Sequence, residues 1–388
     1  MIQAKIVADS LTERGNRLTT MEIVFPRYIL AELNTHRMLS KNSASSRAIP
    51  FRKMVKSVLT NPFIPYAFQK DHLGMQGTEY FDNNTDYSLP EFLTILSDTF
   101  KYQSDLEFKT KEDKQILSLL TEITDKQKET KKTLQEWWLY CRDKAVKCAI
   151  LMASLGVTKQ LANRLLEPFM YHKVLVSGTE WENFFELRGP QYWLEGSKGI
   201  TTVDYKSWKE LSKAYPTMVN EDNSILQKLQ HNKGQADIHM MFLAEAIYDA
   251  IKESTPTKLK DGEWHLPFSN EIDLGKVASL SVNKDLSILE LIQRISISRC
   301  ARLSYQTLGD NPIIDYEADL KLYDNLYKSK HASPFEHVAK AMTDHEYNTY
   351  FKGIADYESI EGYNLTDDKG LGWCRNYRGF IQYRELLD

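Results

Sequence analysis

The sequence predicts a protein that contains both β-strands and long α-helices, and two observations carry this prediction. Apolar and polar residues alternate through residues 1–25 on either side of the turn Arg14-Gly15-Asn16, as expected for a β-hairpin. Four later stretches repeat apolar residues at helical spacing. They predict helices over about 134–155, 235–254, 287–305 and 315–330, and Gly156 provides a C-terminal stop for the first.

Composition excludes several classes of protein. The 388 residues are enough for two domains, or for one domain with large insertions. The formal net charge of -4, with 26% charged residues, argues against a surface that binds nucleic acid. The chain has no secretory-signal pattern and no apolar stretch long enough to cross a bilayer, so we expect a soluble, cytoplasmic protein without membrane partners.

The cysteines fit a reducing compartment. The four form no C-x-x-C pair, and they stand at Cys141, Cys148, Cys300 and Cys374. We expect them to be reduced, packed thiols. None lies in a motif for nucleophilic catalysis.

One polar segment, residues 35–47, stands out as a candidate anion-binding site. Pro26 and the apolar residues after it predict a short buried helix, which delivers His36 and Arg37 into a loop rich in Ser and Asn and closed by Arg47. Small polar side chains leave backbone N–H groups free, and arginines offer forked donors to phosphate oxygens. By composition alone, a polar surface loop after a helix is the favoured interpretation of the segment.

Other cofactor chemistries find little support in the residues. His36, His331, Glu336 and His337 would be the candidate zinc ligands, but their spacing matches no usual ligand pair and no His-Glu-x-x-His occurs, so we expect no metal. The chain also lacks G-x-G-x-x-G and P-loop motifs, so neither a Rossmann cofactor site nor ATP use is expected.

The polar segment resembles a motif of the flavin-dependent thymidylate synthases. The matching pattern is His-Arg-x-x-Ser-x-Asn-x-x-Ser-x-Arg, here His36, Arg37, Ser40, Asn42, Ser45 and Arg47. Further stretches are similar to the same family: Ala301 to Tyr305, His331 to His337, Asn183 to Arg188, and Gly234 to Ile238 with Asp237 in place of the usual Glu.

The order of these stretches differs from that of the family. There the Ser-Pro-Phe-Glu-His segment precedes the His-Arg loop, whereas here it follows about three hundred residues later. Circular permutation accounts for this order, because it is tolerated where the original termini lie close together. The resemblance thus implies a single catalytic domain over 1–388 with insertions at 52–133, 189–231 and 256–284.

Two departures fall inside the polar segment. Thr35 stands where the family has an arginine, and Ser43 stands where it often has a glutamate. The permutation leaves the tail after the Ser-Pro-Phe-Glu-His segment, where the family places its arginine. Arg384 or Arg378 is therefore the candidate replacement for the missing cation.

The resemblance implies an α+β fold in which long helices pack an antiparallel sheet, assembled as a homo-oligomer (tetramer or dimer) with active sites between subunits. It implies methylation of dUMP at C5 with methylenetetrahydrofolate as carbon donor, FAD as hydride carrier and NADPH or NADH as reductant. The partners would then be a nucleotide and a folate.

The resemblance also assigns roles to residues. Arg188 and Arg47 would be catalytic, with Arg188 facing the pyrimidine; read alone, Arg188 is also an ordinary cation in the last turn of a helix. The remaining dUMP contacts would be Ser43, Ser45 and Ser46. The FAD contacts would be His36, Arg37, Asn42, Asn183, Ser304, His331, Ser333 and Glu336.

Two alternatives remain at this level. The departures at Thr35 and Ser43 fit a related hydroxymethylase acting on dUMP or dCMP, in which water in place of hydride quenches the transferred carbon. The chain also fits a homologue that binds nucleotide without catalysis.

Overall fold

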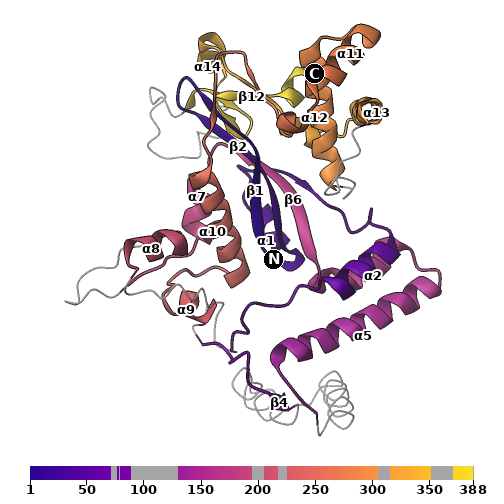
Figure 1. The fold of residues 1–388 in the computed structure, drawn as a ribbon, viewed down its shortest axis with the longest axis vertical. Helices are drawn as coiled ribbons and strands as arrows, with labels where there is room; N and C mark the ends of the chain where they lie inside the picture. Colours follow the sequence, from indigo (N-terminus) through magenta and orange to yellow (C-terminus); the bar gives the residue numbers. More distant parts are fainter. Residues whose placement is uncertain are drawn as a thin grey trace.

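A five-stranded sheet forms the centre of the computed structural model, which describes residues 1–70, 77, 79–88, 130–194, 205–216, 225–304, 315–350 and 370–387 (Figure 1). The strand order is β3-β6-β2-β1-β7, and all neighbours are antiparallel except β1 and β7. The strands are β1 (Gln3–Thr12), β2 (Arg17–Pro26), β3 (Ser40–Ser43), β6 (Tyr171–Gly178) and β7 (Thr257–Leu259). The mixed, antiparallel-rich α+β architecture agrees with the sequence prediction.

The first two strands confirm the predicted hairpin. Gln3 pairs with Val24 and Leu11 with Arg17, with a register shift between Ile6 and Ala8. Gly15 closes the turn with φ +84°, a left-handed conformation that side-chain-bearing residues rarely adopt.

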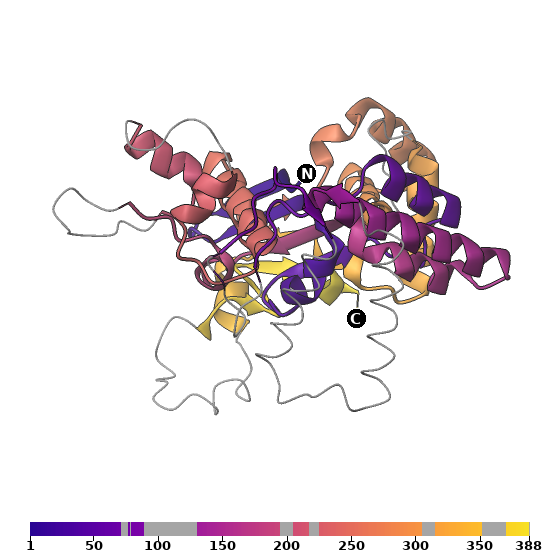
Figure 2. The same ribbon diagram turned by 90° about the horizontal axis from the view of Figure 1, so that it is seen from below.

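Helices cover the two faces of the sheet. Alternation along β6 turns Val174 and Val176 toward one face, where they pack against α7 (Glu182–Arg188) and α10 (Ile238–Glu253). Leu175 points to the other face and packs against Cys300 of α12 (Ile288–Ser304). Burial of apolar side chains on both faces stabilises this layer structure (Figures 1 and 2).

The predicted long helices are present. α5 spans Leu134–Ser154 and α13 spans Tyr316–Lys328. A capping box begins α5, since Thr133 Oγ1 accepts from the backbone N–H of Glu136 and the Glu136 carboxylate accepts from the N–H of Thr133. Gly156, at φ +85°, follows its end as predicted.

One helix, α2 (Phe51–Thr60), lies in a stretch whose periodicity predicted no element. It begins directly after Pro50 and buries Met54 and Val58 against Val146 and Ala149 of α5. Its apolar residues recur at helical spacing, at Phe51, Met54, Val55, Val58 and Leu59, so the sequence carried the signal of this helix and the interpretation of the stretch as aperiodic was wrong.

Short elements complete the described chain. The remaining α-helices are α1 (Leu30–Asn34), α6 (Lys159–Ala162), α8 (Trp208–Ala214), α9 (Ile225–Gln230), α11 (Leu274–Lys284) and α14 (Asp344–Thr349). The 3-10 helices are η1 (Arg27–Ile29), η2 (Asn163–Phe169), η3 (Ser269–Glu271), η4 (Ser333–Glu336) and η7 (Tyr383–Leu386). The small strands are β4 (Tyr87–Ser88), β5 (Lys131–Lys132), β8 (Trp264–His265), β9 (Ala339–Ala341), β10 (Trp373–Cys374), β11 (Tyr377–Arg378) and β12 (Phe380–Gln382).

The span 256–284 is built into the core of the described structure. It supplies β7 to the main sheet and β8 to a second sheet of order β12-β9-β8. Val277 of α11 packs against α12 and α13. That this span is an insertion remains a prediction. If it is one, the inserted residues supply strands to two sheets.

Two features bear on the expected environment of the chain. All four cysteines are free, as predicted, but Cys141 and Cys148 are exposed on α5, which corrects the prediction that all four are packed. Apolar residues repeat at helical spacing along the whole of α5, which made both cysteines look packed. The two positions do not belong to the buried face of the helix. In the described part of the chain, no helix is both long enough and apolar enough to cross a membrane.

Candidate functional site

His36 and Arg188 form the first part of the candidate site. His36 follows α1 and is 7% exposed, and its ring packs edge-on against Phe184 of α7 at 4.9 Å between centroids. Arg188, the last residue of α7, donates from Nε to His36 Nε2 at 3.1 Å. Burial, reinforced by the charges of Arg188 and Lys41, lowers the pKa of His36 to about 4. The imidazole is therefore neutral at pH 7 and acts as an acceptor for Arg188.

Lys41 fixes the turn between α1 and β3. Its ammonium donates to the carbonyl oxygens of Leu33 at 3.2 Å and His36 at 2.5 Å, which also accept from backbone N–H groups of the turn after α1. Burial lowers the pKa of Lys41 to about 8. The bonds from Lys41 hold the backbone of His36 at a fixed distance from the strand.

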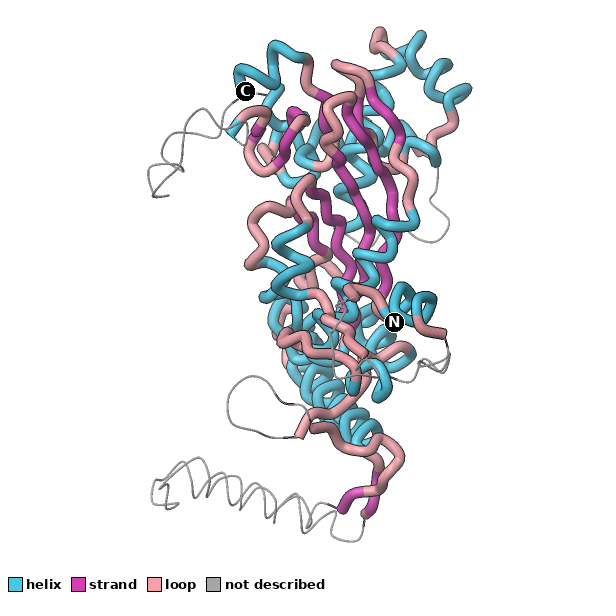
Figure 3. Tube along the Cα trace, turned by 90° about the vertical axis from the view of Figure 1, so that its left-hand side faces the viewer, coloured by secondary structure: helices cyan, strands magenta, loops and turns pink. Residues whose placement is uncertain are grey.

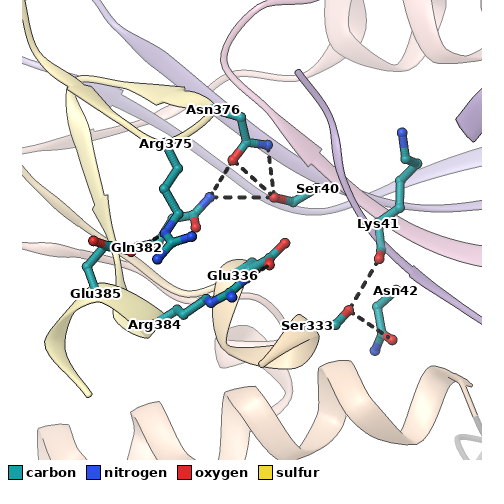
Figure 4. Close-up of polar contacts among 10 residues, drawn as sticks. All are labelled: Ser40, Lys41, Asn42, Ser333, Glu336, Arg375, Asn376, Gln382, Arg384 and Glu385. Atoms are coloured by element: carbon teal, nitrogen blue, oxygen red, sulfur yellow. Dashed lines mark hydrogen bonds and ion pairs between the residues drawn. The ribbon is translucent and has the colours of Figure 1, made fainter. Parts of the chain in front are cut away.

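Asn42 joins this segment to residues far away in the sequence. Its side-chain amide donates to the carbonyl oxygen of Cys300 in α12 at 2.7 Å. Ser333 Oγ lies 3.3 Å from the carbonyl oxygen of Lys41 and 3.4 Å from Asn42 Oδ1 (Figure 4). The structure thus places the Ser-Pro-Phe-Glu-His segment beside the His36–Arg47 segment, although about 290 residues separate them.

Arg384 pairs with the same distant segment. Its Nη1 lies 2.5 Å from Glu336 Oε1, and both side chains are only partly exposed. Arg375 forms a second ion pair with Glu385 nearby (Figure 4). The tail therefore brings a cation to the Ser-Pro-Phe-Glu-His segment, where the permuted order predicted one, but Arg384 contacts Glu336 and not Thr35.

The site residues divide between the two faces of β3, which is an edge strand of the main sheet. Ser40 and Asn42 share the face covered by α12 and η4, whereas Lys41 and Ser43 point to the opposite face, where Lys41 bonds to Leu33 of α1 and Ser43 to His172 of β6. His36 and Arg188 lie on the α7 side. The candidate site thus consists of two polar groups on opposite faces of one edge strand.

The serines predicted to bind phosphate make contacts within the chain. Ser43 Oγ lies 2.6 Å from His172 Nε2, and Ser46 Oγ donates to Glu167 Oε1 at 2.5 Å. Arg47 is exposed and donates to Gln160 Oε1 at 3.3 and 3.2 Å. Ser45 is half-buried.

Several predicted FAD contacts are not brought into this arrangement. Arg37, Asn183 and His331 are exposed, and within the described residues none of their side chains bonds to the groups above. Ser304 is the last residue of α12, and its side chain lies outside the described residues. Asp237 caps the start of α10 by accepting from the N–H groups of His239 and Met240.

The tail contributes polar residues that the motifs did not identify. Asn376 Nδ2 donates to Ser40 Oγ at 3.0 Å and to the carbonyl oxygen of Met38 at 3.2 Å. Gln382, which is fully buried, donates to Asn376 Oδ1 at 2.7 Å. Figure 4 shows these side chains gathered around Ser40. In the sequence, these residues are marked by the number of Asn, Gln and Arg residues in a tail that is otherwise rich in aromatic residues.

A buried chain of hydroxyl and imidazole groups crosses the sheet behind Ser40. Ser177 Oγ lies 2.8 Å from His337 Nδ1 and 2.6 Å from Thr20 Oγ1. Thr20 continues to His265 Nε2, and His265 Nδ1 continues to Ser10, each at 2.8 Å. Burial lowers the pKa of both histidines to about 3. The sequence signal for this network was Thr20, a polar residue within the strand pattern of the hairpin. A buried threonine hydroxyl needs a hydrogen-bond partner.

Two surface hollows among the described residues lie away from this region. One is between α2 and α5, and another is among α8, α9 and α10. In the described ranges, no group of three or more His, Cys, Asp or Glu side chains is arranged to hold a metal ion.

Comparison with known proteins adds no family assignment. No protein-family model matches the chain, and no curated protein matches it. The assignment of function therefore depends on the residues and their geometry.

Proposed function

We propose that this chain is a circularly permuted, flavin-dependent thymidylate synthase-like enzyme that methylates dUMP at C5. The observation that carries the proposal is the contact of Ser333 with Lys41 and Asn42. A permuted enzyme needs its Ser-Pro-Phe-Glu-His segment beside its His-Arg loop, and an unrelated chain has no reason to bring these two motifs together. The bond from Arg188 to His36 adds the third motif segment to the same region.

The donor set around β3 fits an anionic, planar cofactor such as FAD. His36 and Arg188 provide a neutral imidazole and a cation on one side of β3, and Asn42 and Ser333 provide amide and hydroxyl groups on the other. Guanidinium groups suit a pyrophosphate, and amide groups suit the edges of a flavin ring. When bound, FAD would supply the hydride, with NADPH as the source of reducing equivalents and methylenetetrahydrofolate as the source of carbon.

Arg188 would position and polarise the pyrimidine. Because the Nε–H is held by neutral His36, the guanidinium is fixed in one orientation; Nη2 lies 3.5 Å from Thr35 Oγ1. A fixed cation beside a pyrimidine carbonyl stabilises negative charge as electron density moves toward C5. A protonated histidine would repel Arg188, so the low pKa of His36 favours this arrangement at neutral pH.

The division of the polar groups over both sides of β3 favours an assembly in which a second copy completes each half of the site. Exposed apolar side chains on α2, α5 and α6 supply the surface that such an assembly would bury. We therefore include a homo-oligomer in the proposal.

A hydroxymethylase is the second candidate, and the surroundings of Thr35 favour it. The Thr35 hydroxyl stands beside Arg188, where the family has a guanidinium, and it donates to the carbonyl oxygen of Glu32 at 2.6 Å. A hydroxyl at this point would orient a water molecule, whereas an arginine would exclude it. In that enzyme, water quenches the carbon transferred to dUMP or dCMP.

The experiment combines a spectrum with product analysis. The purified protein is expected to be yellow, with flavin absorbance bands, and to convert dUMP in the presence of methylenetetrahydrofolate and NADPH. Mass analysis of the products from dUMP and dCMP separates a methyl from a hydroxymethyl group. A colourless protein that takes up no added FAD and turns over neither nucleotide contradicts both enzyme proposals, and nucleotide binding would then be the remaining function.

A further inference from the structure

Lys41 brings a positive charge into a half-buried position of the candidate site, at a point that the motif of the polar segment leaves unspecified. Its side chain reaches from β3 back to the end of α1, away from Asn42 and Ser333 (Figure 4). The ammonium bonds to the carbonyl oxygens of Leu33 at 3.2 Å and His36 at 2.5 Å. Burial lowers the pKa of Lys41 to about 8, so the side chain is still mainly cationic at pH 7. Within the described residues, the acceptors of this cation are neutral carbonyl oxygens.

His36 lies between this cation and a second one. Arg188 Nε donates to the ring at Nε2, and Lys41 bonds to the backbone of the same residue. Burial, and then the charges of Arg188 and Lys41, lower the pKa of His36. The charged groups that act on this pair from the surrounding elements are Lys41 of β3 and Glu32 of α1, whose carboxyl group interacts with Arg188. Each positive charge opposes protonation of the ring, because a third positive charge there would be repelled.

The bond between Arg188 and His36 requires a neutral ring. Nε2 accepts from the guanidinium, so the ring carries its hydrogen on Nδ1. A protonated ring has a hydrogen on both nitrogens and offers Arg188 no acceptor. Any group that disfavours protonation of His36 therefore preserves the orientation of Arg188. Lys41 does this from a different element of the fold.

We propose that Lys41 is a positioning residue for Arg188 that acts through His36 in two ways. Its bonds fix the backbone of His36 at the end of α1, and its charge keeps the ring in the form that accepts from Arg188. The consequence for catalysis rests on the proposed function, in which Arg188 polarises the pyrimidine. The coupling between Lys41 and His36 does not rest on it, because it follows from their positions and charges.

The test is the titration of His36 in the variant Lys41→Met, which keeps an unbranched apolar side chain and removes the ammonium. The titration is followed by NMR of protein labelled with ¹³C-histidine, and the signal of His36 is identified by its absence in His36→Gln. The pKa of His36 is expected to rise by about one pH unit, because one of the two neighbouring positive charges is gone. An unchanged pKa of His36 in Lys41→Met would overturn the proposal.

Two further variants separate the charge of Lys41 from its role in holding the turn. Lys41→Gln removes the charge but keeps an amide donor, so it should raise the pKa of His36 as much as Lys41→Met does. It also provides the measurement if Lys41→Met does not fold. Lys41→Arg keeps both charge and donors, and the pKa of His36 should stay within about 0.3 pH units of wild type. A lysine that only holds the turn predicts a smaller change in Lys41→Gln than in Lys41→Met, which would contradict the proposed effect of its charge.

Lys173→Met is the matched control. Lys173 lies on the neighbouring strand β6, and its ammonium pairs with Glu22, so this variant changes the net charge by the same amount. The pKa of His36 is expected to stay within about 0.2 pH units of wild type, because a more distant charge is screened by solvent and salt. An equal rise in Lys173→Met and in Lys41→Met would overturn the assignment to Lys41.

Turnover of dUMP separates this proposal from the proposed function. Lys41→Met should lower the turnover number about tenfold and change the KM for dUMP less than threefold, because orientation of Arg188 matters most in the transition state. The acid limb of its pH profile should move upward together with the pKa of His36, and Lys41→Arg should restore both. A shifted pKa of His36 in a protein without turnover supports the coupling while the proposed enzyme fails. Turnover with an unshifted pKa overturns only the role of Lys41.

Discussion

At the scale of single residues, the candidate site depends on neutral histidines that accept from cations. His36 accepts from Arg188, and His172 accepts from Arg27. Burial and the adjacent guanidinium lower the pKa of His36 to about 4 and that of His172 to about 3. Each histidine orients an arginine without adding positive charge, which leaves the arginines available for an anionic ligand.

Arg188→Ala tests the catalytic role at this scale. We expect flavin binding to remain and the turnover number to fall about a hundredfold, because one charge-stabilising donor is removed while most cofactor contacts stay. Flavin content is measured by absorbance and turnover by conversion of dUMP. Gln191→Ala, three residues beyond Arg188 and exposed, is the control and should keep wild-type turnover. Unchanged turnover in Arg188→Ala would remove Arg188 from the mechanism.

The buried histidines predict how stability depends on pH. His265 has a pKa of about 3 in the folded chain, because burial disfavours its charged form, whereas an unfolded histidine titrates near 6.5. The unfolded state therefore binds more protons below pH 6.5, and the free energy of unfolding falls as pH drops. This one group accounts for a loss of about 2 kcal/mol between pH 7 and pH 5.

Urea unfolding at several pH values measures this effect. Wild type should lose stability between pH 7 and pH 5, and His265→Gln should show a shallower dependence, with about one proton fewer taken up on unfolding. The exposed His331→Gln is the control and should keep the wild-type dependence. Parallel profiles for His265→Gln and wild type would show that His265 does not drive the loss.

At the scale of elements, the short strand β3 organises the site. Its four residues alternate between one face that packs against α12 and an opposite face on which Lys41 bonds to Leu33 of α1. The tail holds its first residue in place, since Asn376 bonds to Ser40 and to Met38. The position of β3 therefore depends on a segment more than three hundred residues away.

Asn376→Ala should weaken this junction. The substitution leaves the fully buried Gln382 without the acceptor it uses at 2.7 Å, and an unsatisfied buried polar group costs about 1–3 kcal/mol. We expect the free energy of unfolding to fall by about 2 kcal/mol, measured by urea denaturation. Asn183→Ala, at an exposed position of α7, is the control and should change it by less than about 0.5 kcal/mol. Similar values for the two variants would contradict the proposed role of the tail.

At the scale of the whole molecule, α2 and α5 lie to one side of the central sheet (Figure 1), and Figure 3 shows helices (cyan) gathered below the long strands (magenta). Together with α6, α2 and α5 carry exposed apolar side chains. Exposed side chains include Leu59 at 46%, Leu155 at 70% and Leu161 at 60%. Contiguous exposed apolar patches usually mark contacts with another protein. In the proposal, the other protein is a second copy of this chain.

Leu155→Glu with Leu161→Glu tests the assembly. Analytical ultracentrifugation should show wild type as an oligomer, and the double variant should shift toward monomer, because two charges at the centre of an apolar contact cannot be desolvated cheaply. Leu274→Glu, also exposed but on α11, should leave the mass unchanged. A monomeric wild type would contradict the assembly, and with it an active site shared between copies.

Local patterns by themselves determined much of the fold and part of the site. The hairpin, α5, α10, α12 and α13 follow from periodicity and end signals, since a 2-residue or 3.6-residue repeat is a property of the local sequence. The motifs also placed Ser333 and Asn42 in one predicted site, and Ser333 Oγ lies 3.4 Å from Asn42 Oδ1. The tail arginine predicted as a replacement for the cation missing at Thr35 pairs with Glu336 instead.

Only the tertiary structure decided the remainder. Whether Ser46 faces solvent or Glu167, whether Ser43 is free or bonded to His172, and how β3 divides the site between two faces all depend on which distant groups pack beside them. Hydrogen bonds between side chains more than a hundred residues apart leave no periodic trace in the sequence. The sequence therefore determined which polar residues the chain carries, and the packing of α12, η2 and the tail around one edge strand decided which of them meet.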